Sequence, residues 1–182
     1  MKKYLYQELL NQRLTNQDAI NANRHPISLI LHNIRSLYNV GSIFRTADSA
    51  LAEELILCGF TPFPPRKEID KTALGATSSV PWQYKENILD AIKEQKAKGK
   101  KIAALELTNN SINYNKLSLS DFPLSIVLGN EISGVDDFIL NECDLSIQIP
   151  MYGVKHSLNV AVATGIALFE AVNTWRNLNH LS

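Results

Sequence analysis

Three polar segments of the chain could carry chemistry, and each directly follows an apolar run typical of a buried strand. The first covers residues 33–47 and contains Arg35, Asn39 and Arg45. Because amides at a helix start attract anions and arginine binds phosphate through charged hydrogen bonds, a phosphate could bind there. In an alternative interpretation, Asn39 only caps the helix and Arg45 pairs with Asp48.

The second and third segments are also loops that follow strands. Residues 128–134 form a glycine-bounded loop of the kind that binds ligands in open α/β sheets, where Gly129 would let a ligand approach the backbone. Glu131 could equally be a surface carboxylate near the next helix start. Residues 149–160 lead into the last helix, and Ser157 as its N-cap would by itself explain that segment.

Several familiar chemistries lack their motifs. The sequence has no G-x-G-x-x-G, no G-x-x-x-x-G-K-[ST] and no G-x-S-x-G. This disfavours dehydrogenases, P-loop enzymes, serine hydrolases and methyltransferases of the Rossmann type. The four histidines and the pair Asp136 and Asp137 show no metal-ligand spacing, so we expect no metal.

The elements that position these segments alternate between strands and helices. We expect strands at residues 27–32, 55–59, 101–105, 124–129 and 145–149, and helices at 40–54, 86–98 and 157–176. Residues 60–80, rich in proline, read as a loop or short helix. Strands alternating with helices, two of them almost continuously apolar, indicate an α/β fold with a largely parallel sheet.

The two ends of the chain differ from this pattern. Residues 3–23 have leucines at helical spacing and predict a short amphipathic helix, so we divide the chain into an extension at 1–25 and one main domain at 26–182. The last helix is apolar on most sides, and the sheet can cover only one of them. We therefore expect a homodimer that forms through this helix.

Composition limits the class of protein. The 182 residues carry equal numbers of basic and acidic side chains, which argues against a general cationic surface. Residues 1–50 nevertheless carry six Lys or Arg against three Asp or Glu, so a polyanion would meet the first half. No run approaches the ~20 apolar residues of a membrane span. With no secretory signal and only Cys58 and Cys143, both expected to be buried, we expect a cytoplasmic protein that does not bind membranes.

Together the three segments resemble a known family. The patterns N-x-G-x-x-x-R-T-A at 39–47, L-G-N-E-x-x-G at 128–134 and I-P-M-x-G-x-x-x-S-L-N-V at 149–160 match, in order and spacing, the three motifs of the SpoU/TrmH branch of the SPOUT RNA methyltransferases. The likeness extends over residues 27–172. One departure is Ala161, where many relatives carry serine.

The resemblance implies a fold, a cofactor and an assembly. Its members have an α/β sheet with a deep trefoil knot in the C-terminal part, work as homodimers and bind S-adenosylmethionine among the knotted loops. Carried over by motif, the cofactor-binding positions are Leu105, Glu106, Leu128, Gly129, Ile149, Met151, Ser157 and Leu158. Leu105 and Glu106 lie in a loop that has little motif of its own.

The implied reaction is methylation of a ribose 2′-hydroxyl in tRNA or rRNA, and DNA, which lacks this hydroxyl, is not an expected substrate. The motif residues assigned to catalysis are Arg45, Asn39, Glu131, Ser157 and Asn159, with Arg35 and Arg45 expected to bind RNA. A guanidinium holds its proton tightly, so we expect Arg45 to grip a phosphate and polarise the hydroxyl. Two alternatives stay open: a protein that binds RNA or a nucleotide without methyl transfer, and a flavodoxin-like nucleotide binder.

Overall fold

The structure is a computed structural model and describes residues 1–5, 7–8 and 14–179. Its strands are β1 (His25–His32), β2 (Ala52–Cys58), β3 (Trp82–Lys85), β4 (Lys101–Leu105), β5 (Ile112–Asn113), β6 (Leu124–Leu128) and β7 (Leu145–Gln148). Its helices are α2 (Asn16–Asn21), α3 (Leu37–Ser49), α4 (Lys67–Ala73), α5 (Ile88–Ala97), α6 (Asp137–Leu140) and α7 (Val160–Leu178). Short 3-10 turns are η1 (Ala76–Ser78), η2 (Tyr114–Lys116) and η3 (Leu119–Asp121).

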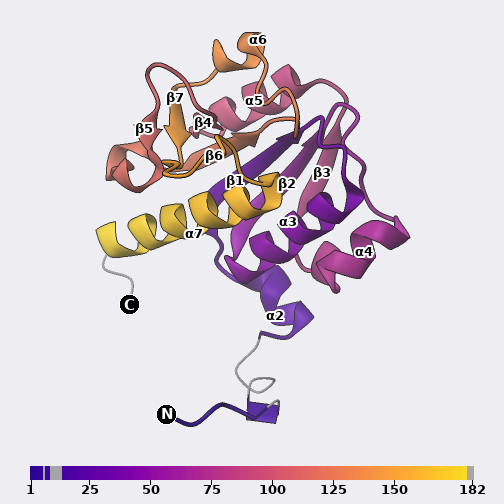
Figure 1. The fold of residues 1–182 in the computed structure, drawn as a ribbon. Helices are drawn as coiled ribbons and strands as arrows, with labels where there is room; N and C mark the ends of the chain where they lie inside the picture. The colour runs from indigo at the N-terminus through magenta and orange to yellow at the C-terminus, as the bar shows by residue number, and fades with distance from the viewer. Residues whose placement is uncertain (6, 9–13, 180–182) are drawn as a thin grey trace.

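In the described part of the chain, the strands form one seven-stranded sheet in the order β3-β2-β1-β6-β4-β7-β5 (Figure 1). Every neighbouring pair is parallel. This confirms the α/β class with a parallel sheet that alternating strands and helices predicted. Because all strands point the same way, their carboxyl ends lie along one edge of the sheet. The trefoil knot that the resemblance implies stays a prediction.

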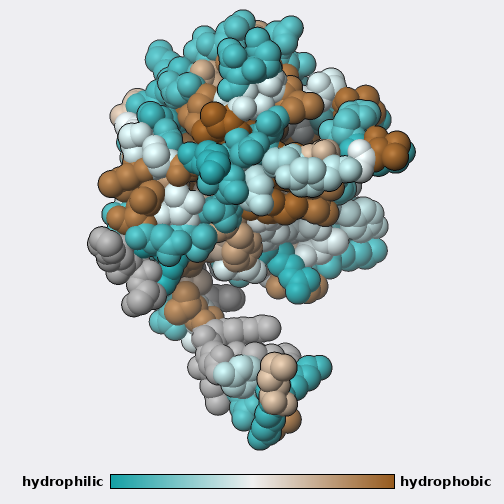
Figure 2. Space-filling model, turned by 60° about the vertical axis from the view of Figure 1, so that its left-hand side comes forward, coloured by the Kyte–Doolittle hydropathy of each residue, from teal (hydrophilic) through white to brown (hydrophobic). Residues whose placement is uncertain are grey.

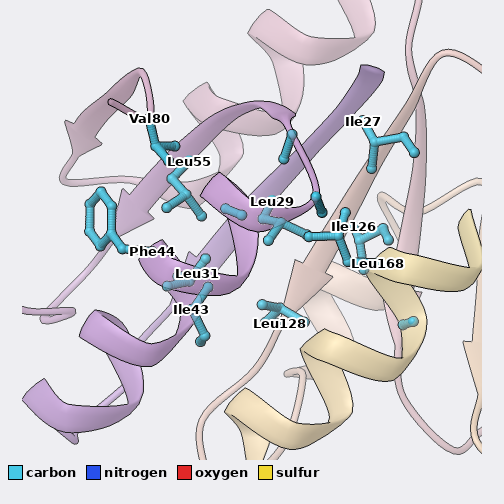
Figure 3. Close-up of a cluster of buried hydrophobic side chains, with 14 of the residues drawn as sticks. Ile27, Leu29, Leu31, Ile43, Phe44, Leu55, Val80, Ile126, Leu128 and Leu168 are labelled. Atoms are coloured by element: carbon cyan, nitrogen blue, oxygen red, sulfur yellow. The ribbon is translucent and has the colours of Figure 1, made fainter. Parts of the chain in front are cut away.

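Side chains of each central strand alternate between two cores. Leu29 and Leu31 of β1 pack on the face covered by α3 and α7, together with Phe44 and Leu168 (Figure 3). Ile30, between them in sequence, joins the second core, which α5 and α6 cover. This alternation follows from the two-residue period of a strand, and it explains why a strand buried on both faces reads as one apolar run.

The second core contains one of the two cysteines. Cys58 is buried there, and burial raises the pKa of its thiol to about 12. Cys143 packs against the same core but is only partly buried, so the expectation of two buried thiols was right for one of them. Burial also raises the pKa of the Cys143 thiol, to about 11.

Helix α3 is shorter at its end than expected. The sequence predicted a helix over 40–54, but α3 ends at Ser49 and residues 52–54 already belong to β2. Leu51 between them has a left-handed φ of 50°, which reverses the chain. Ala52 and Glu54 then pair with β1, and this pairing outweighs their helix propensity.

The remaining expected elements are present with small shifts. The strands predicted at 101–105, 124–129 and 145–149 are β4, β6 and β7, and the helix predicted at 86–98 is α5, capped by Asn87. Residues 60–80 contain α4 and η1. The sequence analysis missed β3 and β5, which are short edge strands without a continuous apolar run.

The N-terminal segment differs from the single helix predicted at 3–23. Residues 1–5 are not helical, and Thr15 caps a separate short helix, α2, through a capping box with Asp18. The central leucines of the predicted helix, Leu9 and Leu10, lie outside the described residues. Arg24 joins this segment to the main body, since its guanidinium donates to the carbonyls of Ala19, Ala52 and Ser79. The boundary at residue 25 stays a prediction.

Helix α7 is the last element and lies beside α3 (Figure 1). It begins at Val160, so the helix start predicted at Ser157 was wrong. One face of α7 is buried, with Ala167, Leu168 and Ala171 against the sheet. Val162 and Phe169 of the same helix are about half exposed. No helix in the described ranges is long and apolar enough to cross a membrane.

Candidate functional site

The loops that follow β4, β6 and β7 surround a cavity of about 1030 Å³ at the carboxyl edge of the sheet. This is the edge at which open parallel sheets bind ligands. All eight positions expected to bind the cofactor line this cavity: Leu105, Glu106, Leu128, Gly129, Ile149, Met151, Ser157 and Leu158. Residues from three distant stretches of the sequence therefore meet around one cavity, as the family resemblance implied. The walls combine apolar side chains with the polar backbone of irregular loops, which suits an organic ligand with apolar and polar parts.

A second, smaller cavity of about 510 Å³ adjoins the first. Its lining consists of Arg35, Ser36, Asn39, Glu131, Ile132 and Asn159. Glu131, Ile132 and Asn159 line both cavities. These three residues therefore form the boundary between the two cavities.

The carboxylate of Glu131 holds the loop that precedes α3. It accepts hydrogen bonds from the backbone N–H groups of Arg35 (2.9 Å) and Ser36 (3.1 Å) and from Nδ2 of Asn39 (3.0 Å). Partial burial acts to raise the pKa of the Glu131 carboxyl, but these hydrogen bonds outweigh it and hold the pKa below its ordinary value. Glu131 is therefore ionised at neutral pH and already occupied as an acceptor.

This arrangement changes the expectation for the start of α3. The anion that meets the amides of Arg35 and Ser36 is the protein's own Glu131, so these amides are not free for a phosphate. The helix cap is Ser36, whose Oγ accepts from the N–H of Asn39. Asn39 is thus inside the helix, and the interpretation of Asn39 as the cap was wrong.

Asn159 connects the third segment to the first. Its Nδ2 donates to Oδ1 of Asn39 (3.1 Å), and its own Oδ1 accepts from the N–H groups of Ala161 and Val162. Asn159 is therefore the N-cap of α7, the role that the sequence had given to Ser157. Through Glu131, Asn39 and Asn159, the three segments form one continuous set of hydrogen bonds.

Position 129 requires glycine because another part of the chain, the backbone at Gly134, lies close to it. A Cβ at Gly129 would lie 2.2 Å from the carbonyl carbon of Gly134. A Cβ at Gly134 would lie 2.2 Å from Oε2 of Glu106, the oxygen that accepts the N–H of Val135. The two glycines thus let the 128–134 loop fold back on itself and against Glu106, which follows β4, whereas the sequence had predicted a ligand at this place.

The two arginines differ in their relation to the cavities. Arg35 lines the smaller cavity. Arg45 is exposed on α3 and lines neither cavity. The alternative pairing of Arg45 with Asp48 does not occur, because Asp48 accepts a hydrogen bond from Ser79 and no described carboxylate lies within ion-pair distance of Arg45.

Two asparagines at the site were not singled out in the sequence. Asn130 donates from Nδ2 to the carbonyl of Asn33 (2.7 Å), and its Oδ1 accepts from the N–H groups of Ile132 and Ser133. Asn33 has a left-handed φ of 56°, and its Oδ1 accepts from the N–H of Phe60. An asparagine directly after a strand is typical of such a turn, and that signal could have identified Asn33.

The family model of the SpoU rRNA methylase family matches residues 26–169. The chain is 32% identical over 142 residues to a Staphylococcus haemolyticus protein assigned to the TrmH family of tRNA/rRNA methyltransferases, covering 78% of this chain and 56% of that protein. A Staphylococcus aureus protein of the same description is 34% identical over the same length. The chain spans less than two thirds of the length of these relatives.

Solved structures of SpoU and TrmH proteins are also similar to this chain. The A. aeolicus TrmH/SpoU tRNA modifying enzyme superposes with a TM-score of 0.80 at 29% identity, covering 95% of this chain and 87% of the other. An AdoMet-bound rRNA methyltransferase from Sinorhizobium meliloti superposes with a TM-score of 0.76 at 32% identity, covering 90% and 60%. The family match spans the sheet and all three loops of the site, and the chain therefore belongs to the SpoU rRNA methylase family.

Proposed function

We propose that the chain binds S-adenosylmethionine in the larger cavity and methylates a ribose 2′-hydroxyl of an RNA nucleotide bound in the smaller one. The observation that carries this proposal is that the two cavities are neighbours and share Glu131, Ile132 and Asn159 as lining residues. Methyl transfer requires the acceptor oxygen to approach the methyl carbon in line, so donor and acceptor sites must adjoin. Family membership and the AdoMet-bound relative support this assignment.

The larger cavity fits this cofactor in size and in chemistry. Its volume of about 1030 Å³ is at the upper end of the range for cofactor-sized ligands. Leu105, Leu128 and Ile149 offer an apolar wall for a purine ring, and the backbone of the 128–134 loop offers hydrogen bonds. When bound, S-adenosylmethionine supplies an electrophilic methyl group, and the protein contributes position and charge.

Glu131 acts in this proposal as a positioning residue. Its carboxylate already accepts three hydrogen bonds and has a lowered pKa, which makes it a weak general base. Its role is to hold Arg35 and Asn39 at the wall of the smaller cavity. Asn159 holds the third loop on the other side through its hydrogen bond to Asn39, and Ser157 lines the larger cavity.

Arg45 supplies the charge. It is exposed and has no carboxylate partner among the described residues, so its guanidinium can bind an RNA phosphate. Arg45 lines neither cavity, so in this proposal it acts on the hydroxyl through the bound phosphate, which takes the proton. Arg35 contributes a second cation beside the nucleotide. The acceptor hydroxyl is absent from DNA, so the substrate is RNA, either tRNA or rRNA. An RNA substrate agrees with the cytoplasmic location expected from the sequence.

The proposed assembly is a homodimer that forms through α7. Val162 and Phe169, seven residues apart, lie on one helix face together with the partly buried Ile166, and both outer side chains are about half exposed. Figure 2 shows hydrophobic patches interrupted by hydrophilic residues on the side of the molecule that carries α7 and β5. A second copy would cover this face and remove its apolar surface from water.

The experiment that tests the function combines the purified protein, labelled S-adenosylmethionine and total tRNA and rRNA from a strain that lacks it. Digestion then identifies any labelled nucleoside. We expect a 2′-O-methylated nucleoside that is lost with Arg45→Ala, while cofactor affinity and thermal stability stay unchanged because Arg45 is exposed. Label on a base would refute the ribose assignment. Cofactor binding without transfer to any RNA would favour the binding-only alternative.

A further inference from the structure

Three exposed aromatic side chains come from β3 and from the loop that follows β2. Phe60, Phe63 and Tyr84 are 61%, 42% and 40% exposed, and we name them the aromatic platform. The ring centroids of Phe63 and Tyr84 are 4.6 Å apart. Phe63 also stacks on Trp82 at 6.5 Å, and Trp82 in turn packs edge-on against Phe44 of the core. Phe63 and Tyr84 are thus held from below, and all three rings are open to solvent.

The backbone that presents the platform is fixed by hydrogen bonds. The hydroxyl of Tyr84 donates to the carbonyl of Gly59 (2.8 Å), and the N–H of Phe60 donates to Oδ1 of Asn33 (3.1 Å). Thr61 is buried, and its Oγ1 donates to the carbonyl of Leu31. A rigid loop that holds apolar rings in water gains little stability from them, and such surfaces mark binding sites.

The loop that carries Phe60 is linked to the smaller cavity through Asn33. Asn33, which binds the N–H of Phe60, directly precedes the segment that supplies Arg35 and Ser36 to that cavity. Its carbonyl is held by Asn130 of the 128–134 loop. β3 lies two strands from β1 in the sheet, which corresponds to about 10 Å along the carboxyl edge. Nucleotides that flank the one in the smaller cavity would reach this distance.

The charges beside the platform suit the phosphates of a nucleic acid. Arg66 and Lys67 follow the platform loop at the start of α4; both are exposed and form no ion pair with a described carboxylate. Glu68 and Asp70, also exposed, follow on the same helix and reduce the net charge there. Phosphate contacts should therefore be few, which leaves the aromatic faces as the main source of affinity.

We propose that the aromatic platform binds an unpaired nucleotide next to the methylated one, by stacking its base on Phe60, the most exposed of the three rings. This inference rests on the proposed function, because it takes the smaller cavity as the site of the target nucleotide. Aromatic side chains stack on bases of any sequence, and bases in RNA loops are free to turn outwards. The platform would thus select RNA in which the target lies in an unpaired loop.

The test compares two fluorescein-labelled RNA probes, a stem-loop with an unpaired loop and a fully paired duplex. Phe60→Ala and Phe60→Leu should each weaken stem-loop binding about five- to tenfold, since one exposed stack is lost, and should leave duplex binding unchanged. Phe60→Trp should retain the affinity, because it restores a stacking face. The matched control is Leu119→Ala. Leu119 is an exposed side chain of η3, which precedes β6 and so lies at the amino-terminal ends of the strands, away from the platform.

Further readouts separate stacking from structure and the platform from the proposed function. In Phe60→Ala, cofactor affinity, thermal stability and molecular mass should match wild type. The KM for an RNA that the wild type methylates should rise, while kcat stays the same. Full binding by Phe60→Leu, or a lower molecular mass in Phe60→Ala, would overturn the proposal in favour of an apolar or a protein contact. If wild type transfers no methyl group but Phe60→Ala still loses stem-loop binding, the platform stands and the proposed function fails. If wild type transfers the methyl group and Phe60→Ala binds the stem-loop as wild type does, the proposed function stands and the platform fails.

Discussion

Replacement of Glu131 by glutamine tests whether this residue positions the loops or acts as a base. The carboxylate accepts from Ser36 N–H and Asn39 Nδ2 at Oε1 and from Arg35 N–H at Oε2. Glutamine keeps one oxygen and can retain the first two hydrogen bonds. Its amide nitrogen then faces the N–H of Arg35, so one hydrogen bond is lost and two donors oppose each other.

The size of the effect follows from these contacts. A hydrogen bond to a charged group contributes about 1.5–3 kcal/mol when protected from water, but Glu131 is exposed, so about 1 kcal/mol is reasonable after screening. In a chain of this length that lowers Tm by about 3 °C. If the same free energy is lost from the placement of the nucleotide, kcat falls about fivefold.

A double-mutant cycle with Asn39→Ala makes the test specific. Asn39→Ala removes the Nδ2 donor and also the link to Asn159. If Glu131 acts through Asn39, the double variant loses less stability and less kcat than the two single losses added together. Thermal unfolding and single-turnover methyl transfer measure both quantities on the same preparations.

A different result would refute this reasoning. Removal of a general base costs about 10²- to 10⁴-fold in rate, so a loss of that size in Glu131→Gln with unchanged Tm would show that Glu131 takes the proton. Additive effects in the cycle would also contradict a role through Asn39. The pH profile separates the two roles further, since a positioning residue leaves its shape unchanged.

Three further changes have expected outcomes. Gly129→Ala should cost about 1–3 kcal/mol and weaken cofactor binding, measured by calorimetry, because its Cβ would lie 2.2 Å from Gly134. Below pH 6.5 the free energy of unfolding, measured in urea, should fall, because burial lowers the pKa of His32 despite nearby Asp136 and the unfolded chain takes up the proton first. Phe169→Arg should convert the proposed dimer to a monomer by light scattering, because it places a charge on the exposed apolar face of α7.

Each of these predictions has a control. Gly153→Ala should leave stability unchanged, because nothing lies within 4 Å of its Cβ. His32→Leu should flatten the fall in stability that begins at pH 6.5 and ends below the lowered pKa; an equal slope in this variant would assign the fall to other groups. Leu89→Arg, at an exposed position of α5 on the other face of the sheet, should leave the molecular mass unchanged. A wild-type monomer would refute the dimer directly.

Much of the site could be predicted because local pattern and topology agree. The apolar runs of β1 and β6 end at Asn33 and Gly129, and in a parallel sheet such ends share one edge. The motif residues that follow must therefore meet, whatever the details of the loops. The eight positions that the family resemblance implied for the cofactor line one cavity at this edge, and their role in binding it stays a prediction.

The roles of individual side chains were harder to predict because they depend on partners distant in sequence. Nothing near Glu131 shows that Arg35 and Ser36, 96 and 95 residues earlier, would donate to it. For the same reason, the capping of α7 by Asn159 was missed, since Ser157 is an equally good cap by type. Only the fold shows that Asn159 is held by Asn39 at that position.

The hydrogen bonds of the site suggest why its polar residues need not take part in the chemistry directly. Glu131, Asn39 and Asn159 use their polar atoms mainly on one another and on backbone N–H groups. Three irregular loops would otherwise be free to move, since none is part of the sheet. A reaction that depends on alignment of two substrates gains more from rigid loops than from a reactive side chain, because misplacement by about 1 Å can cost about a hundredfold in rate. Loss of any one of these three side chains should therefore weaken the binding of substrates in both cavities.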